Sequence, residues 1–225
     1  MTVPSLFDPS LVPVVSTDHH LPAVAPQALQ SAALRLRFAH PPAWSPQFHT
    51  EPKFSSRAPA HASVLIPLVM RDERLTVLLT QRTAHLSSHS GQVAFPGGKA
   101  DPEDIDAVAT ALREAQEEIG LDPSHVEVIG SMPTYTTGSA YVVTPVVALV
   151  HPGMVLTLNA DEVADAFEVP LSYLMDPAHH RHHVVEWEGA RRHWLSMPYQ
   201  DGAHQRFIWG ATAGMLRNLY QFLLL

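Results

Sequence analysis

The chain has 225 residues, of which 46% are hydrophobic and 16% charged, and its formal net charge is −8. These values predict one substantial domain with a buried core, and the negative balance argues against a nucleic-acid binder that works through a broad basic face. The sequence contains no cysteine, which excludes disulfides, thiolate metal sites and cysteine nucleophiles.

The N-terminal part of the chain is rich in proline. Residues 1–27 are predicted to form an extended leader that lacks the pattern of a signal peptide, and no apolar run in the chain reaches the ~18 residues of a membrane span. We therefore expect a cytoplasmic protein with no membrane partner. Residues 26–40 are predicted to form a short helix, and prolines make residues 41–61 irregular.

Strand-like segments dominate the next part of the chain. Residues 62–70 and 74–82 are predicted to be two strands that flank a turn, and residues 125–135 and 141–151 are further strand candidates. Strands interspersed with a few helices predict an α/β domain, which we expect to extend over residues 28–225 as a single unit.

Three more elements are predicted toward the C-terminus. Residues 161–175 favour a short helix or a turn, residues 182–199 a hairpin, and residues 209–225 an apolar helix. Apolar side chains recur at helical spacing in the last segment, which indicates either core packing or a homodimer interface. These side chains are Met215, Leu216, Leu219, Tyr220 and Leu223.

Residues 97–122, GGKADPEDIDAVATALREAQEEIGLD, predict an amphipathic helix. Asp101–Pro102 and Asp106 are candidate starts, because Asp caps free backbone amides and Pro suits a first turn, and Gly120 is a natural end. Apolar residues recur at steps of three and four and form one stripe. The stripe consists of Ile105, Val108, Leu112, Ala115 and Ile119.

Three glutamates, Glu114, Glu117 and Glu118, share the opposite side of this helix within a sector of about 100°. Like charges at this spacing repel, and no lysine follows residue 100 to neutralise them. Because hard divalent cations bind carboxylate oxygens, the sequence favours a metal site over the alternative of a solvated surface face. The double glycine at 97–98 would let the backbone approach a ligand or metal closely.

Residues 113–121, REAQEEIGL, resemble the second half of the Nudix box, G-x5-E-x7-R-E-U-x-E-E-x-G-U, in which U is a bulky apolar residue. The first half is one residue longer than the pattern, and Ile105 stands where its first glutamate belongs. The nearest acids are Glu103 and Asp104, so the role of that glutamate stays unassigned.

The segment before the helix resembles more specifically the coenzyme A pyrophosphatase branch of the Nudix hydrolases. Residues 78–82 (LLTQR), Gly91 and residues 95–98 (FPGG) match the signature of this branch, which also carries the longer first half of the box. Thr83 stands where the branch usually has Ser or Ala, and Ser87 where it usually has Arg. The second departure puts one basic substrate contact in question.

The resemblance implies a Nudix fold, a mixed β-sheet sandwiched between α-helices, and hydrolysis of a nucleoside diphosphate derivative with Mg²⁺ or Mn²⁺ as cofactor. It implies that Glu114 and Glu118 bind the metal and that Glu117 is a third ligand or holds a coordinated water molecule. Gly98 would offer its carbonyl oxygen to the metal, and Arg113 would brace the glutamates by a bidentate ion pair.

The resemblance leaves the catalytic base open between two sources. One source is the box itself, with Glu114 and Glu117 as candidates, and the other is an acid in a later loop. Among the late acids Glu162 is favoured over Asp161 and Asp165, because loops of this family often carry a functional glutamate. The alternative for Glu162 is an ordinary acid at the start of a helix.

For coenzyme A, the products would be 4′-phosphopantetheine and adenosine 3′,5′-bisphosphate. Arg82 is the candidate phosphate contact, with a structural ion pair as the alternative. His89, Gln92 and Gly97 are candidates for contacts in the substrate pocket. Residues 134–141 are either a substrate loop or an ordinary turn.

Three other functions stay open. The first is a Nudix enzyme for ADP-ribose, a dinucleotide or a nucleoside triphosphate, and the second is a catalytically silent nucleotide-binding module, against which the retained glutamates count. The third is a metal-binding protein that uses the histidines of residues 179–183, HHRHH. Adjacent residues of a strand point to opposite faces, so a solvated loop is favoured over a zinc site for these histidines.

Overall fold

The computed structural model describes residues 8–53, 55–72, 74–84, 91–187 and 190–225. Its helices are α1 (Ser31–Ala39), α2 (Ala107–Ile119), α3 (Leu171–Leu174) and α4 (Gly210–Leu224). Short 3-10 turns lie at Pro9–Leu11, Pro26–Leu29, Pro123–His125 and Pro177–His179. The strands are β1 (Val14–Thr17), β2 (Ala60–Arg71), β3 (Arg74–Arg82), β4 (Val93–Ala94), β5 (Gly97–Lys99), β6 (Val126–Ser131), β7 (Tyr135–Thr136), β8 (Tyr141–Val150), β9 (Val163–Pro170), β10 (Arg181–Trp187), β11 (Ala190–Asp201) and β12 (His204–Trp209).

An eight-stranded sheet forms the centre of the fold. Its main path runs β4-β3-β2-β8-β6, while β5 pairs with β2, β7 with β8 and β9 with β3. Strands β2 and β8 are parallel, whereas β2 and β3 are antiparallel. The sheet is therefore mixed, as the sequence predicts.

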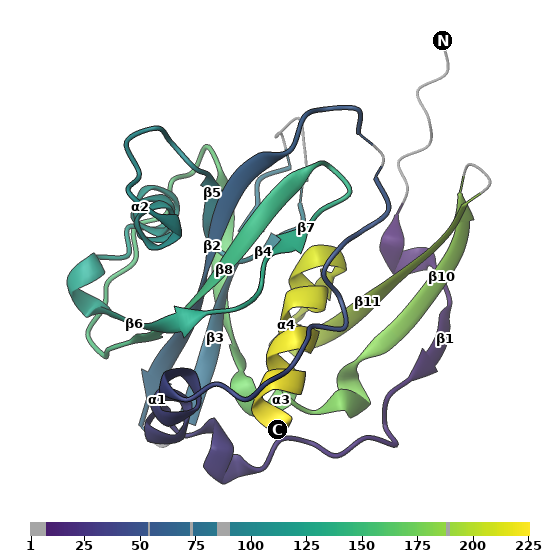
Figure 1. Ribbon diagram of the computed structural model, residues 1–225, viewed down its shortest axis with the longest axis horizontal. Coiled ribbons are helices and arrows are strands. Elements are labelled where there is room, and N and C mark those ends of the chain that lie inside the picture. Colours follow the sequence, from purple (N-terminus) through teal and green to yellow (C-terminus); the bar gives the residue numbers. More distant parts are fainter. Residues whose placement is uncertain (1–7, 54, 73, 85–90, 188–189) are drawn as a thin grey trace.

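Helices cover both faces of this sheet (Figure 1). On one face, Ala111, Ala115 and Ile119 of α2 pack against residues of β2, β3 and β8 such as Leu65. On the other face, side chains of α1 and α4 join a second and larger core cluster that also includes β11. Alternate residues of the strands point to the two faces, and because both faces are covered the central strands are mostly apolar. The predicted arrangement of a sheet sandwiched between helices is confirmed.

A second sheet, with strand order β1-β10-β11-β12, lies on the far side of α4 from the central sheet (Figure 1). Strands β10 and β11 form the predicted hairpin, whose turn at Glu188–Gly189 is outside the described residues. Residues 14–17 of the predicted leader form the edge strand of this sheet, and Val24 is buried in the core. The boundary between a leader and a domain at residue 28 stays a prediction.

The prediction of a helix or turn over residues 161–175 is wrong for most of that segment. Residues 163–170 form β9, which pairs antiparallel with β3, and only residues 171–174 are helical. The reason is visible at the C-terminal half of the strand, where Phe167 and Val169 are buried in the larger core cluster with the polar Glu168 between them, while Val163 is buried in the cluster beneath α2. This period of two fits a strand, and its register against β3 decides the conformation.

Of the two candidate starts of α2, Asp106 is confirmed as the N-cap and Asp101–Pro102 lies before the helix, and the predicted end at Gly120 is confirmed. Asp106 Oδ1 accepts a hydrogen bond from the Ala109 N–H at 2.8 Å, and Gly120 ends the helix in the left-handed conformation with φ 66°. The predicted apolar stripe is correct for Ala115 and Ile119 but wrong for Ile105, which precedes the helix and is 90% exposed. Because Ile105 lies before the N-cap residue Asp106, it is outside the helix, and the helical period does not set the direction of its side chain.

The apolar stripe of α4 packs inside the same chain. Met215, Leu216, Leu219, Tyr220 and Leu223 are all buried in the larger core cluster. Of the two alternatives for this stripe, core packing is therefore confirmed, and a homodimer has to use another surface. No helix in the part of the chain that the structure describes is long and apolar enough to cross a membrane.

Leu216→Ala is expected to lower the free energy of unfolding by about 2–5 kcal/mol, because it removes fully buried methyl groups and leaves a cavity. Leu224 on the same helix is 42% exposed, so Leu224→Ala is the matched control and should change this free energy by about 0.5 kcal/mol or less. Urea unfolding followed by circular dichroism measures both. Equal losses for the two variants would contradict the placement of α4 in the core.

Candidate active site

The glycine pair brings β5 against β2 and against helix α2. Gly97 has a φ of 152°, and a Cβ atom there would collide with the Ser63 carbonyl oxygen of β2. At Gly98 an added Cβ would lie 2.5 Å from the Glu114 carboxylate. A Cβ at Gly97 would meet backbone and one at Gly98 would displace the Glu114 carboxylate, so the pair is required for this close approach of backbone to carboxylate.

Glu118 is buried beneath this glycine turn. Its side chain is 4% exposed, Oε2 accepts a hydrogen bond from the Gly97 N–H at 3.1 Å, and Oε1 lies 3.5 Å from Arg82 Nη1. Burial raises the pKa of Glu118 to about 7, against the opposing effects of Gly97 and Arg82, and the charges of Glu114 and Glu162 raise it further. The carboxylate thus lies in a place that disfavours its charged form unless a cation is near.

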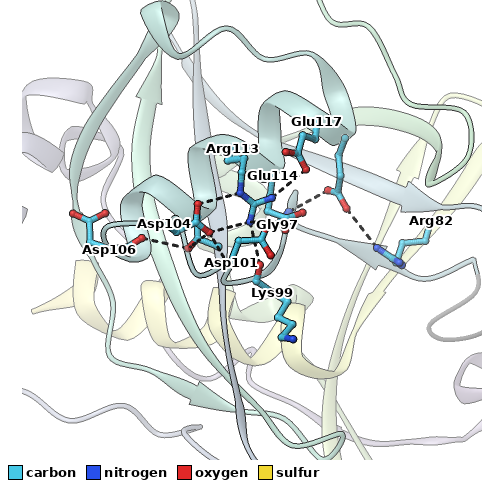
Figure 2. A network of polar contacts seen from close by, with 11 residues as sticks. Arg82, Gly97, Lys99, Asp101, Asp104, Asp106, Arg113, Glu114 and Glu117 are labelled. Atoms are coloured by element: carbon cyan, nitrogen blue, oxygen red, sulfur yellow. Dashed lines mark hydrogen bonds and ion pairs between the residues drawn. The ribbon is translucent and has the colours of Figure 1, made fainter.

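Glu114 and Glu117 both contact the guanidinium group of Arg113. Glu114 Oε1 lies 3.1 Å from Arg113 Nη2, and Glu117 Oε2 lies 3.1 Å from Nη1 (Figure 2). The Glu114 side chain is 16% exposed and burial raises its pKa, whereas Glu117 is 57% exposed. The three glutamates therefore differ in burial, and the alternative of a solvated surface face describes Glu117 alone.

Asp104, one of the two acids nearest to the missing glutamate of the box, binds the guanidinium group of Arg113. Its Oδ1 accepts a hydrogen bond from Arg113 Nε and its Oδ2 one from Nη2, both at 3.0 Å, and Oδ2 also accepts from Thr110 Oγ1 and from the Asp101 N–H at 2.9 Å (Figure 2). These donors, with Arg113 first, hold the pKa of Asp104 well below its usual range. Arg113 is thereby fixed on one side by Asp104 and turned toward the glutamates on the other.

The late acid Glu162 lies near the box glutamates. Its charge raises the pKa of both Glu114 and Glu118, and the Asn159 N–H donates to the Glu118 carbonyl oxygen at 2.9 Å, which ties the loop before β9 to the end of α2. The Thr83 N–H donates to the Glu162 carbonyl oxygen at 3.0 Å.

The other two late acids of the sequence prediction have different surroundings. Asp165 forms an ion pair with Arg206 at 2.5 Å, and the carbonyl oxygen of Asp161 accepts a hydrogen bond from Thr83 Oγ1 at 3.1 Å. The charge that raises the pKa values of Glu114 and Glu118 from this loop is that of Glu162.

The donor set fits a divalent cation. Burial raises the pKa of Glu114 and of Glu118, and the charge of Glu162 raises both pKa values further. The positive charges of Arg82 and Arg113 therefore do not fully offset the cost of ionising these two buried carboxyl groups. As the side chains stand, no three His, Asp or Glu groups among the described residues converge on one point. Glu118 instead contacts Gly97 and Arg82, and Glu114 contacts Arg113. A bound cation would have to replace some of these contacts.

A cleft of about 400 Å³ opens beside the glycine pair. Arg82, Gln92, Gly97 and Gly98 line it, together with Lys99 and Trp209. Arg82 both pairs with Glu118 and faces this cleft, and within the described residues its buried Nε has no hydrogen-bond partner. His89 lies outside the described residues.

Sequence reasoning missed Glu51 in the wall of this cleft. Its Oε2 accepts a hydrogen bond from the Gly138 N–H at 2.8 Å and its Oε1 one from Tyr135 Oη at 3.0 Å, so it holds the 134–141 segment in place. No sequence motif marks this contact, because the partners are more than 80 residues apart.

The histidines of residues 179–183 are held by protein partners. His180 and His183 are buried, and His183 Nε2 hydrogen-bonds to Ser196 Oγ at 2.7 Å. His182 Nε2 pairs with Asp18 Oδ2 at 2.8 Å. The expected solvated loop is wrong, because β10 and the turn before it carry these side chains into packed surroundings. They form no metal cluster within the described part of the chain.

Residues 59–198 match the family model described as NUDIX domain. The chain belongs to the Nudix hydrolase family. It is therefore a hydrolase of nucleotide diphosphate derivatives, and Nudix hydrolases generally use divalent metal ions, which agrees with the carboxylate face of α2.

Several curated relatives of this Nudix hydrolase share one name. The chain is 42% identical over 175 residues to the "Uncharacterized Nudix hydrolase NudL" of Photorhabdus laumondii, covering 78% of this chain and 91% of that protein. It is 45% identical over 159 residues to the protein of the same name from Escherichia coli, covering 70% and 80%.

Solved structures with a similar fold include other Nudix proteins. A C. elegans Ap4A hydrolase matches with a TM-score of 0.43 and 20% identity, over 53% of this chain and 85% of its own. A Nudix hydrolase from M. smegmatis, RenU, matches with a TM-score of 0.45 and 22% identity, over 55% and 78%.

Proposed function

We propose that this Nudix hydrolase cleaves the diphosphate bond of coenzyme A and its derivatives to 4′-phosphopantetheine and adenosine 3′,5′-bisphosphate, with Mg²⁺ or Mn²⁺ as cofactor. One observation carries the choice of substrate. The segment that resembles the coenzyme A pyrophosphatase branch supplies Arg82, Gln92 and Phe95 to the wall of the cleft beside the glycine pair.

The box residues would act as follows. Glu118 and Glu114, one helical turn apart, would hold the metal together with Glu117 and the Gly98 carbonyl oxygen. When bound, the metal would offset charge on the diphosphate oxygens and lower the pKa of a water molecule. Arg113 would keep Glu114 and Glu117 oriented, because Asp104 fixes its guanidinium.

Side chains around the cleft would bind the substrate and accept the proton of the attacking water. Arg82 would bind a phosphate oxygen from the wall of the cleft, with Gly97 and Gln92 beside it, and its position next to Glu118 would place the diphosphate against the carboxylates. Glu162 would accept the proton of the attacking water, because it is a carboxylate near the metal site whose side chain engages only Asn159 among the described residues, at 3.4 Å.

A substrate panel tests the proposal. The protein is incubated with Mg²⁺ or Mn²⁺ and coenzyme A, dephospho-coenzyme A, ADP-ribose, NADH or diadenosine polyphosphates, and the products are identified by chromatography and mass spectrometry. We expect coenzyme A to give the two named products and EDTA to abolish the reaction. A preference for ADP-ribose or a dinucleotide by orders of magnitude would contradict the coenzyme A assignment. No hydrolysis of any compound with either metal would contradict the metal-dependent mechanism.

A further inference from the structure

We infer that Arg206 of β12 is a positioning residue for the reaction, because it fixes the end of β3 from which Arg82 reaches the cleft. This inference rests on the proposed function, in which Arg82 binds a phosphate oxygen of the substrate. Arg206 acts on the substrate through Arg82 and not by a contact of its own.

Arg206 reaches from the second sheet to the central sheet. Its Nη1 donates a hydrogen bond to Gln81 Oε1 of β3 at 2.7 Å, and its Nη2 donates to Asp165 Oδ2 of β9 at 2.5 Å. Its guanidinium carbon lies 4.2 Å from the centre of the Phe167 ring. Within its own sheet, Nε and Nη2 donate to Asp201 Oδ2 at 3.0 and 2.9 Å. One guanidinium group, on a side chain that is 8% exposed, thus joins two adjacent strands of the central sheet to the second sheet.

The pairing of β3 with β9 is irregular at the two residues that the guanidinium group holds. Gln81 pairs with Asp165, whereas Arg82 pairs with Val163, so β9 has one residue more than β3 at this point. Such a β-bulge redirects the side chains next to it and is often found beside an active site. Arg82 directly follows the bulge on β3, and Glu162 directly precedes Val163 on β9.

The side chain of Arg82 has little anchorage of its own. Its Nη1 lies 3.5 Å from Glu118 Oε1, and its buried Nε has no hydrogen-bond partner among the described residues. The backbone is better held, since the Arg82 N–H donates to the Gln92 carbonyl oxygen at 2.9 Å. The direction of the Arg82 side chain therefore follows from the position of the end of β3. A misplacement of about 1 Å at a substrate-positioning group can cost about 100-fold in rate.

The alternative role for Arg206 is a purely structural ion pair between the two sheets. Arg217 of α4 offers a matched control, because its side chain is 5% exposed and its Nη1 lies 3.1 Å from Asp18 Oδ2. Both Arg206→Met and Arg217→Met should lower the melting temperature, since each removes a buried charge and leaves its partners unpaired. A smaller fraction of folded enzyme lowers the apparent kcat and leaves KM unchanged, so KM separates positioning from loss of stability.

Steady-state kinetics of Arg206→Met tests the inference, with the compound of the substrate panel that is hydrolysed fastest. We expect KM to rise about tenfold or more and kcat to stay within about threefold, because a lost hydrogen bond to a charged group weakens binding by this factor and loss of uniform binding raises KM alone. Arg217→Met should leave KM within about twofold. An unchanged KM in folded Arg206→Met would overturn the inference.

Gln81→Leu decides the question if Arg206→Met does not fold. The substitution removes only the acceptor on β3 next to Arg82 and leaves the ion pairs of Arg206 with Asp165 and Asp201 in place. We expect KM to rise about threefold or more, because one of the contacts that hold the end of β3 is lost. An unchanged KM in Gln81→Leu would contradict the inference.

A double-mutant cycle with Arg82→Met shows through which residue Arg206 acts. Arg82→Met alone should raise KM at least as much as Arg206→Met. Arg206→Met added to Arg82→Met should raise KM by less than about twofold, because the group that Arg206 positions is gone. If the two effects on KM multiplied, Arg206 would act elsewhere and the inference would fail.

Amide hydrogen exchange measured by nuclear magnetic resonance separates the inference from the proposed function. In Arg206→Met the N–H of Arg82 should exchange about tenfold faster or more relative to the N–H groups in the centre of β3, and this ratio should stay unchanged in Arg217→Met. If no compound of the panel is hydrolysed, the proposed function fails, and the exchange still shows whether Arg206 holds the end of β3. An unchanged ratio in Arg206→Met would overturn the inference in either case.

Discussion

Glu118→Gln is expected to lower kcat roughly 10³-fold with Mg²⁺ or Mn²⁺. The substitution keeps the shape of the side chain and its contact with the Gly97 N–H but removes the buried negative charge that would bind the cation. A bound metal supplies several kcal/mol of stabilisation to a charged transition state, and each 1.36 kcal/mol is a factor of ten in rate. Steady-state kinetics with the preferred substrate measures the effect.

The control for this variant is Glu127→Gln. Glu127 is also a paired carboxylate, at 2.7 Å from Arg35, but it lies on β6 and its side chain is 37% exposed. We expect its kcat to stay within about twofold of the unchanged enzyme, since exposed ion pairs contribute little. If Glu118→Gln retained near-normal turnover, Glu118 would have no role in binding the metal.

Asp104→Asn is expected to lower kcat/KM about 10- to 100-fold, the usual cost of removing a residue that orients metal ligands. The variant loses the charge that anchors Arg113, and Arg113 contacts both Glu114 and Glu117. Its melting temperature should also fall. Because the pKa of Asp104 is lowered in the folded state, its contribution to stability is present above about pH 4 and is lost as the pH falls through the lowered pKa.

Asp101→Asn is the matched control for Asp104→Asn. Asp101 lies 3.8 Å from Arg113 Nη2 and its side chain is 60% exposed, so its ion pair is screened by water. Activity and melting temperature should both stay close to those of the unchanged enzyme. If the two variants behaved alike, the orientation of Arg113 toward the glutamates would not depend on its close contact with Asp104.

Much of the fold and the centre of the site could be predicted from the sequence. The capping residues gave the limits of α2, the apolar segments gave β2, β3 and β8, and the spacing of Glu114 and Glu118 gave a shared carboxylate face. These features depend on local periodicity and on capping chemistry, which a single sequence displays directly.

The remaining features depend on contacts between distant residues. The length of the segment between Gly98 and Arg113 left the first acid of the box undecided, and only the three-dimensional path of the chain brings Asp104 to Arg113. In the same way β9 owes its conformation to pairing with β3, and the wall of the cleft brings together Glu51 and Trp209, far apart in the sequence. No local pattern encodes such pairings.

The central claim is that the carboxylate face of α2 is a divalent-cation site. Electron paramagnetic resonance of free Mn²⁺ tests it most directly, because it reports binding without substrate or turnover. The unchanged protein should bind Mn²⁺ and Glu118→Gln should bind it at least about tenfold more weakly, while Glu127→Gln should bind it normally. Equal binding of Mn²⁺ by the unchanged protein and Glu118→Gln, or no binding by either, would contradict the claim.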